Sequence, residues 1–126
     1  MAIDLLAKFS VTNKIKVDDK DVVKLFAPLL VEGEEIKLAY THLRDKVIFT
    51  DKKIIALDVQ GLTGSKKEFR VFPYSKITSY SVETSGTFDG DSDFKIWLSG
   101  VGAFSIKFAR SLNIHEIGSF LAQRII

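Results

Sequence analysis

The fold is decided by residues 34–77, EEIKLAYTHLRDKVIFTDKKIIALDVQGLTGSKKEFRVFPYSKI. Apolar and polar residues alternate over residues 35–43, which is typical of a strand with one face in water. Three more strands follow after short polar turns, at residues 46–50, 53–59 and 66–72. Gly61 and Gly64 can adopt the positive φ that a tight hairpin needs, and Pro73 ends the fourth strand because it has no N–H for the ladder. The stretch therefore predicts a four-stranded antiparallel sheet.

A second sheet and a closing helix are predicted downstream. The alternation continues in three segments, which are residues 77–84, 94–99 and 104–109. Asn113 is a good helix N-cap, since its side chain can accept a hydrogen bond from an unpaired amide of the first turn. Ile117 and Leu121 lie on one apolar face of the helix that follows, so we expect this helix to dock on a sheet.

The first 33 residues predict a helical leader. The apolar spacing from Ile3 to Phe9 favours a short amphipathic helix. A second helix is expected to begin at the N-cap Asp18 and to end just before Pro28, which cannot continue a helix. The pattern leaves open whether this leader covers its own domain or a neighbouring subunit.

Composition excludes several classes of protein. A chain of 126 residues suits one domain with a real core, and 46% of its residues are hydrophobic. It has no cysteine for a disulfide or a thiolate metal site, which is typical of a reducing cytoplasm. A net charge of +2 gives no strong attraction to nucleic acid. No apolar run approaches the roughly 20 residues that a bilayer requires, and the N-terminus does not resemble a secretory signal.

The residues that usually carry catalysis or bind metal are few. His42 and His115 are the only histidines, and neither has a partner at metal-ligand spacing or a cysteine to activate. Residues 89–93 resemble the opening of a calcium loop, but Phe94 stands where the loop needs glycine and Gly100 where it needs glutamate. We therefore expect no enzyme activity, no cofactor and no metal.

A family resemblance is carried by short motifs in a consistent order. They are Leu30-Val31-Glu32-Gly33-Glu34-Glu35, Arg44-Asp45, Thr50-Asp51, Gly61-Leu62-Thr63-Gly64, Pro73-Tyr74-Ser75-Lys76-Ile77, Val82-Glu83-Thr84-Ser85-Gly86-Thr87-Phe88 and Gly100. In these residues the chain resembles the bacterial pleckstrin-homology (PH) domain family. The likeness runs from about Leu29 to the C-terminus.

The resemblance implies an α+β, mainly β fold. It would be a PH-like β-roll of two packed antiparallel sheets, with four and three strands, capped by a C-terminal helix. The domain would cover residues 34–126, behind the helical leader of residues 1–33. The resemblance also implies a cytoplasmic setting and a closed homo-oligomeric ring of about five subunits. It implies no known ligand or activity.

Two groups of residues are candidates for contacts. Two predicted strands are apolar without alternation and should be covered on both faces. Unless the leader covers them, the candidate oligomer contacts are Ile48, Ile55 and Leu57. In the other register, Ile54 and Ala56 would take the places of Ile55 and Leu57. Four lysines near turns of the first sheet are candidate contacts to an anionic surface: Lys52, Lys53, Lys66 and Lys67. The alternative role of these lysines is to protect strand edges against aggregation. We therefore expect a self-assembling scaffold or interaction module, with a peripheral module for anionic membranes or lipid head groups as the alternative.

Overall fold

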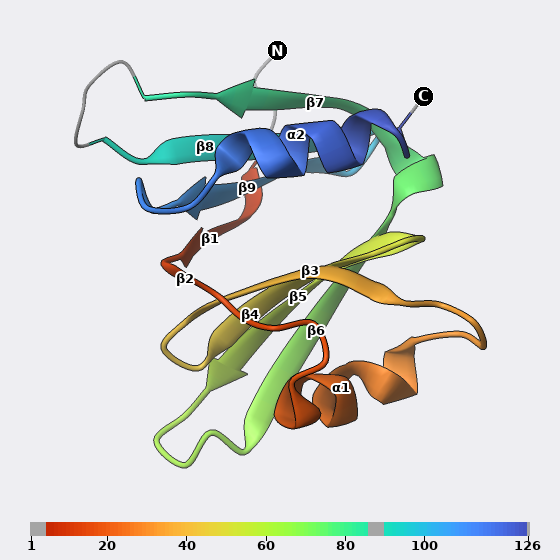
Figure 1. The fold of residues 1–126 in the computed structure, drawn as a ribbon, viewed down its shortest axis with the longest axis vertical. Helices are drawn as coiled ribbons and strands as arrows, with labels where there is room; N and C mark the ends of the chain where they lie inside the picture. The colour runs from red at the N-terminus through yellow and green to blue at the C-terminus, as the bar shows by residue number, and fades with distance from the viewer. Residues whose placement is uncertain (1–4, 86–89, 126) are drawn as a thin grey trace. The chain divides into compact units, whose positions relative to one another are not determined.

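The computed structural model describes residues 5–85 and 90–125. It divides into two compact units, one formed by Asn13–Phe72 and the other by Met1–Thr12 together with Pro73–Ile126. Each unit is built on one β-sheet (Figure 1). The mainly β class, the two sheets and the C-terminal helix are therefore confirmed.

The first unit contains a five-stranded sheet in the order β2-β3-β4-β5-β6. Its strands are β2 (Asn13–Lys14), β3 (Ile36–His42), β4 (Asp45–Thr50), β5 (Lys53–Gln60) and β6 (Lys66–Pro73). The tight hairpin between β5 and β6 has positive φ at Gly61 and Gly64, as the sequence predicts. Pro73 is the last residue of β6, also as expected.

The second unit contains a four-stranded sheet in the order β1-β9-β8-β7. Its strands are β1 (Leu5–Val11), β7 (Ile77–Glu83), β8 (Ser92–Leu98) and β9 (Gly102–Phe108). β7, β8 and β9 form an antiparallel meander, and β1 runs parallel to β9. The seven strands expected from the sequence are β3 to β9, so the sheets have five and four strands instead of four and three.

The two additional strands lie in the segment that was expected to be a helical leader. The prediction of a helix from Ile3 to Phe9 is wrong over the described residues, because β1 begins at Leu5. Phe9 and Val11 are buried while Lys8 and Ser10 are exposed, which is the period of a strand. Hydrogen bonding to β9, a partner distant in sequence, outweighs the local three-residue spacing.

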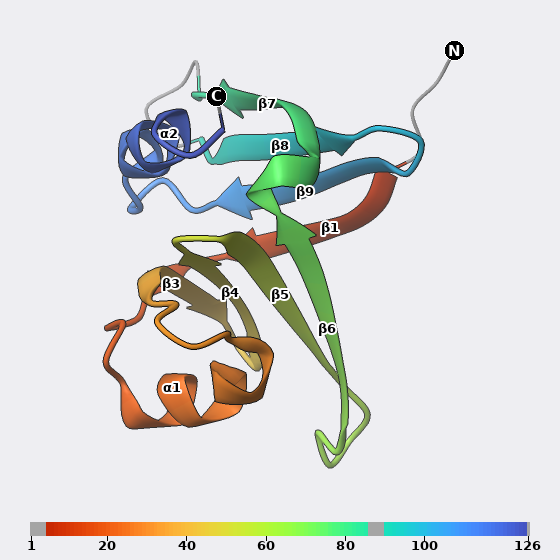
Figure 2. The ribbon, with the colours of Figure 1, turned by 90° about the vertical axis from the view of Figure 1, so that its right-hand side faces the viewer.

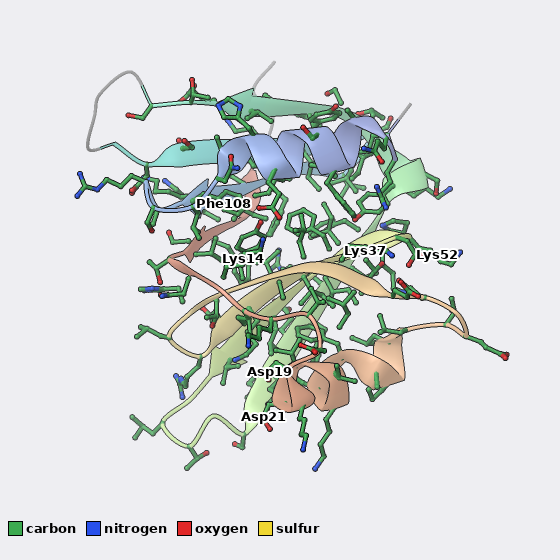
Figure 3. The ribbon with its side chains drawn as sticks, viewed as in Figure 1. Lys14, Asp19, Asp21, Lys37, Lys52 and Phe108 are labelled. Carbon is green, nitrogen blue, oxygen red and sulfur yellow. The ribbon has the colours of Figure 1, made fainter. Side chains whose placement is uncertain are left out.

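The second helix of the leader does form. Helix α1 (Lys20–Phe26) is capped by Asp19, not by the expected Asp18, since Asp19 Oδ1 accepts hydrogen bonds from the amides of residues 21 and 22. The acidic side chains Asp19 and Asp21 lie together at its start (Figure 3). The helix ends before Pro28, which lies in the short 3-10 helix Ala27–Leu29. The stop at Pro28 is thus confirmed.

Helix α2 (Ile114–Ala122) closes the chain. Asn113 caps it as predicted, because Asn113 Oδ1 accepts a hydrogen bond from the amide of His115 at 3.1 Å. Ile117 and Leu121 are fully buried. The helix lies close to β7, since a Cβ built on Gly118 would be 3.7 Å from a methyl group of Val82. The apolar face thus docks on the sheet of its own unit.

Candidate functional site

The candidate oligomer contacts are interior residues. Ile48, Ile55 and Leu57 are fully buried, and they form one cluster with Val22 and Phe26 of α1. Figure 2 shows α1 lying alongside β3 and β4. These three side chains therefore have no surface to offer a second subunit, and their assignment as oligomer contacts is corrected. Of the two covers that the sequence left open, the chain uses its own helix.

The four candidate lysines do not form one patch. Lys52 lies in the turn that precedes β5, whereas Lys66 and Lys67 begin β6, after the turn that follows β5. The length of β5 separates the two pairs by about 20 Å, which is more than the screening length of about 8 Å in physiological salt. Figure 3 shows Lys52 beside Lys37, at the end of the sheet where β4 turns into β5. The two lysine pairs therefore cannot act together as one anion-binding surface.

Lys53 is not available to an external anion. Its Nζ lies 2.9 Å from Glu34 Oε1, and its side chain is only 14% exposed. Thr50 Oγ1 donates to Glu34 Oε2, and the amide of Val31 donates to Oε1 at 3.0 Å. Glu34 therefore ties the loop before β3 to the turn between β4 and β5. This arrangement is structural, and it removes Lys53 from the candidate contacts.

The Glu34 carboxylate is held in its charged form. Burial alone would raise its pKa, but hydrogen bonds from Thr50, Val31 and Lys53, with the positive charge of Lys53, outweigh burial and lower the pKa from 4.5. A catalytic acid or base needs a pKa near the working pH, and a lowered carboxyl pKa moves away from it. Glu34 thus fits an anchor better than a general base.

Two leucines missed by the sequence analysis mark one end of the five-stranded sheet. Leu43, in the turn between β3 and β4, is 85% exposed and has a φ of 54°, which is uncommon for a residue with a large side chain. Leu62, at the tip of the hairpin between β5 and β6, is completely exposed. Arg44 Nη1 donates to the carbonyl oxygen of Gly61 at 2.7 Å, so the two turns are tied together.

The same end of the sheet is basic. Lys66 and Lys67 are exposed beside Leu62, and Arg44 is exposed beside Leu43. The nearby carboxylate of Asp45 accepts a hydrogen bond from the amide of Val59 and is turned to the protein. We call Leu43, Arg44, Leu62, Lys66 and Lys67 the leucine tip. An apolar residue at the centre of each polar turn was the sequence signal that could have identified it.

The four-stranded sheet carries a polar hollow of about 190 Å³. Six side chains from all four strands line it, namely Lys8, Ser81, Glu83, Asp93, Lys95 and Ser105. Drug-sized ligands usually occupy pockets of about 300–1,000 Å³, so this hollow suits only a small polar molecule. No single sequence motif marks it, because register alone brings these residues together.

The histidines and acidic residues do not assemble a metal centre within the described residues. No three histidine, cysteine or acidic side chains gather there in a way that could hold a metal ion. Asp89, the first residue of the calcium-like segment, lies outside the described residues. His42 ends β3 and His115 lies in the first turn of α2, in different units. In residues 5–85 and 90–125 no helix is long and apolar enough to span a bilayer.

Comparison with known proteins places this architecture among relatives. The family model described as Bacterial PH domain matches residues 5–125. The Uncharacterized protein YjqA of Bacillus subtilis (strain 168) is 46% identical over 98 residues, which cover 76% of this chain and 78% of the relative. The Uncharacterized protein YozO of the same organism is 36% identical over 106 residues, which cover 83% of this chain and 90% of the relative.

A solved structure shares the fold. It is the crystal structure of a protein from Shewanella loihica PV-4 with a pleckstrin-homology domain, from a family of unknown function. The TM-score is 0.81 at 32% sequence identity, and the match covers 90% of this chain and 96% of that chain. The match therefore covers most of this chain and nearly all of that chain.

Proposed function

This chain belongs to the bacterial PH domain family, and on that premise we propose that it is a non-enzymatic interaction module that assembles with copies of itself in the cytoplasm. The observation that carries the proposal is the edge strand β6. It is eight residues long and is the last strand of its sheet (Figure 2), and half of its residues are exposed. An open strand edge presents unpaired N–H and C=O groups, which can pair with a strand of another chain.

The geometry of such a contact determines the assembly. If β6 pairs with β6 of a second copy, the contact is isologous and stops at a dimer. If β6 pairs with a different edge of the next copy, the contact is heterologous and can close into a ring. We favour the ring of about five subunits that the family resemblance suggests, since each sheet has two different edge strands.

Light scattering behind size exclusion tests this proposal at micromolar protein. We expect one species with several times the subunit mass of 14.1 kDa. Neighbouring amides of a strand point to opposite edges, so one of the variants Lys67→Pro and Glu68→Pro removes an outward amide. That variant should run as a folded monomer, while the other loses a bond to β5 and is destabilised. A wild type near 14 kDa, or two proline variants that both remain assembled, contradicts the proposal.

The leucine tip favours a second function, peripheral binding to an anionic membrane. Each exposed leucine would contribute roughly 1.5–3 kcal/mol on leaving water. Each basic residue near an anionic bilayer contributes about 1 kcal/mol, and Arg44, Lys66 and Lys67 are in place to do so. Of the lysines expected to act in this way, only the second pair remains in this proposal.

Sedimentation with vesicles separates the two functions. Phosphatidylcholine vesicles with and without about one third phosphatidylserine provide the surfaces, and salt should weaken binding. Leu62→Ser should reduce the bound fraction, whereas Val101→Ser, at another exposed hairpin tip, should not. Equal binding to both vesicle types, or equal effects of the two variants, would exclude the leucine tip as the membrane contact.

A further inference from the structure

The polar hollow of the four-stranded sheet has a regular arrangement of charge. Ser105 of β9 lies opposite Lys8 of β1 on one side and Lys95 of β8 on the other. Ser81 of β7 lies opposite Lys95, so these residues form one row across the sheet, with neighbouring strands about 4.8 Å apart. The serines are too short to fill the space between the lysine side chains, and this shortness creates the hollow.

The second row of the hollow is acidic. Glu83 and Asp93 lie directly opposite each other on β7 and β8. Like charges in this position destabilise a sheet. They are two residues along their strands from the first row, which places the acidic row about 6.6 Å from the basic row on the same face.

The charges of the hollow do not neutralise one another. Among the described residues, its two lysines and two carboxylates form no ion pair with each other. Lys95 instead lies over the ring of Trp97, at 5.6 Å from the centroid. Lys107 is opposite Asp93 on the other side, again without an ion pair. Four charged groups therefore surround one small space without pairing with one another.

We propose that this hollow binds a short zwitterion, such as a dipeptide, with a carboxylate at one end and an ammonium group at the other. Lys8, Lys95 and the hydroxyl of Ser105 receive the carboxylate. The ammonium group lies between Glu83 and Asp93, whose mutual repulsion it relieves. The lining carries no net charge, so a neutral molecule with separated charges matches it at both ends.

Ions of a single charge fit the hollow less well. An anion at the lysine row is repelled by the two carboxylates of the next row. A metal cation would have only two carboxylate ligands and would face Lys95, and no metal-binding group of three side chains is formed within the described residues. The ligand class follows from the pairing of the two rows, and it is independent of how the chain assembles.

Nuclear magnetic resonance titration of the full chain with glycylglycine tests the proposal. We expect saturable shifts of amides in β7, β8 and β9, with a dissociation constant in the millimolar range because the site is open to water. N-acetylglycylglycine lacks the ammonium group and glycylglycinamide lacks the carboxylate. Each should bind about tenfold more weakly, as expected for the loss of one charged contact.

Variants assign the two ends of the ligand. Lys95→Met should weaken the binding of glycylglycine about tenfold. It should leave the binding of glycylglycinamide unchanged, because that ligand has no carboxylate for Lys95 to contact. Asp93→Asn should weaken the binding of glycylglycine and leave the binding of N-acetylglycylglycine unchanged, because that ligand has no ammonium group. Lys107→Met is the matched control on the same sheet face. The proposal would be overturned by the absence of saturable shifts, or by capped ligands that bind as tightly as glycylglycine. It would also be overturned if Lys107→Met weakened the binding of glycylglycine as much as Lys95→Met does.

Discussion

Replacing Glu34 with alanine should lower the free energy of unfolding by about 3 kcal/mol. The carboxylate accepts hydrogen bonds from Thr50, Lys53 and the amide of Val31, all within 3.0 Å. Removal of one partner from a buried ion pair typically costs about 3–5 kcal/mol, since the other charge stays buried. We expect the lower end of this range, because the Lys53 side chain is 14% exposed and can be rehydrated in part.

Urea unfolding at neutral pH measures this loss. With a slope near 2 kcal/mol per molar urea, the midpoint of the Glu34→Ala variant should fall by about 1.5 M. Glu35→Ala is the matched control, because Glu35 pairs with Lys37 at 2.7 Å but its side chain is 69% exposed. Such surface pairs contribute at most about 1 kcal/mol. A loss for Glu34→Ala that equals the control would refute the anchoring role.

The same variant predicts a pH dependence. The pKa of Glu34 is lowered from 4.5 in the folded protein, so the unfolded chain takes up a proton on this group first as pH falls. The advantage of the wild type over Glu34→Ala is therefore complete above about pH 4.5 and decreases as the pH falls through the lowered folded value. Asp51, whose pKa is lowered chiefly by a hydrogen bond from the Glu35 amide, is present in both proteins and cancels in the difference. An equal difference at pH 7 and pH 3 would show that the charge of Glu34 is not used.

Two further substitutions test the core and the hairpin. Leu121→Ala should cost about 2–5 kcal/mol, because the side chain is fully buried in α2, and a melting temperature within a degree of the wild type would show that α2 does not close the core. Gly64→Val should cost about 1–3 kcal/mol, since its φ is +70° and a Cβ would lie 3.3 Å from a methyl group of Val59. Gly118→Ala, where the new Cβ meets Val82 at an ordinary 3.7 Å, should be neutral or stabilising by up to about 1 kcal/mol, and chemical denaturation of both glycine variants provides the comparison.

The sequence by itself determined the elements whose signals are local. The strands β3 and β6 to β9 follow from alternation and turn residues, and β4 and β5 follow from apolar runs between polar turns. The hairpin between β5 and β6 has the positive φ at Gly61 and Gly64 that a tight turn needs. Asn113 marks the start of α2, because its side-chain oxygen accepts a hydrogen bond from an otherwise unpaired amide in the first turn. The burial of the strands around Ile48 and Ile55 on both faces was also visible as an apolar run without alternation.

Only the tertiary structure decided which distant segments meet. Leu5–Val11 became a strand because β9 offered it a parallel partner, which no local spacing can reveal. The packing of α1 over Ile48 also depends on contacts between distant segments. So does the ion pair between Glu34 and Lys53, which leaves the Lys53 side chain only 14% exposed. The polar hollow depends on the register of four strands, in which single side chains of each strand meet across the sheet. Register is set by hydrogen bonds between strands, and a one-residue shift would turn every one of these side chains to the other face.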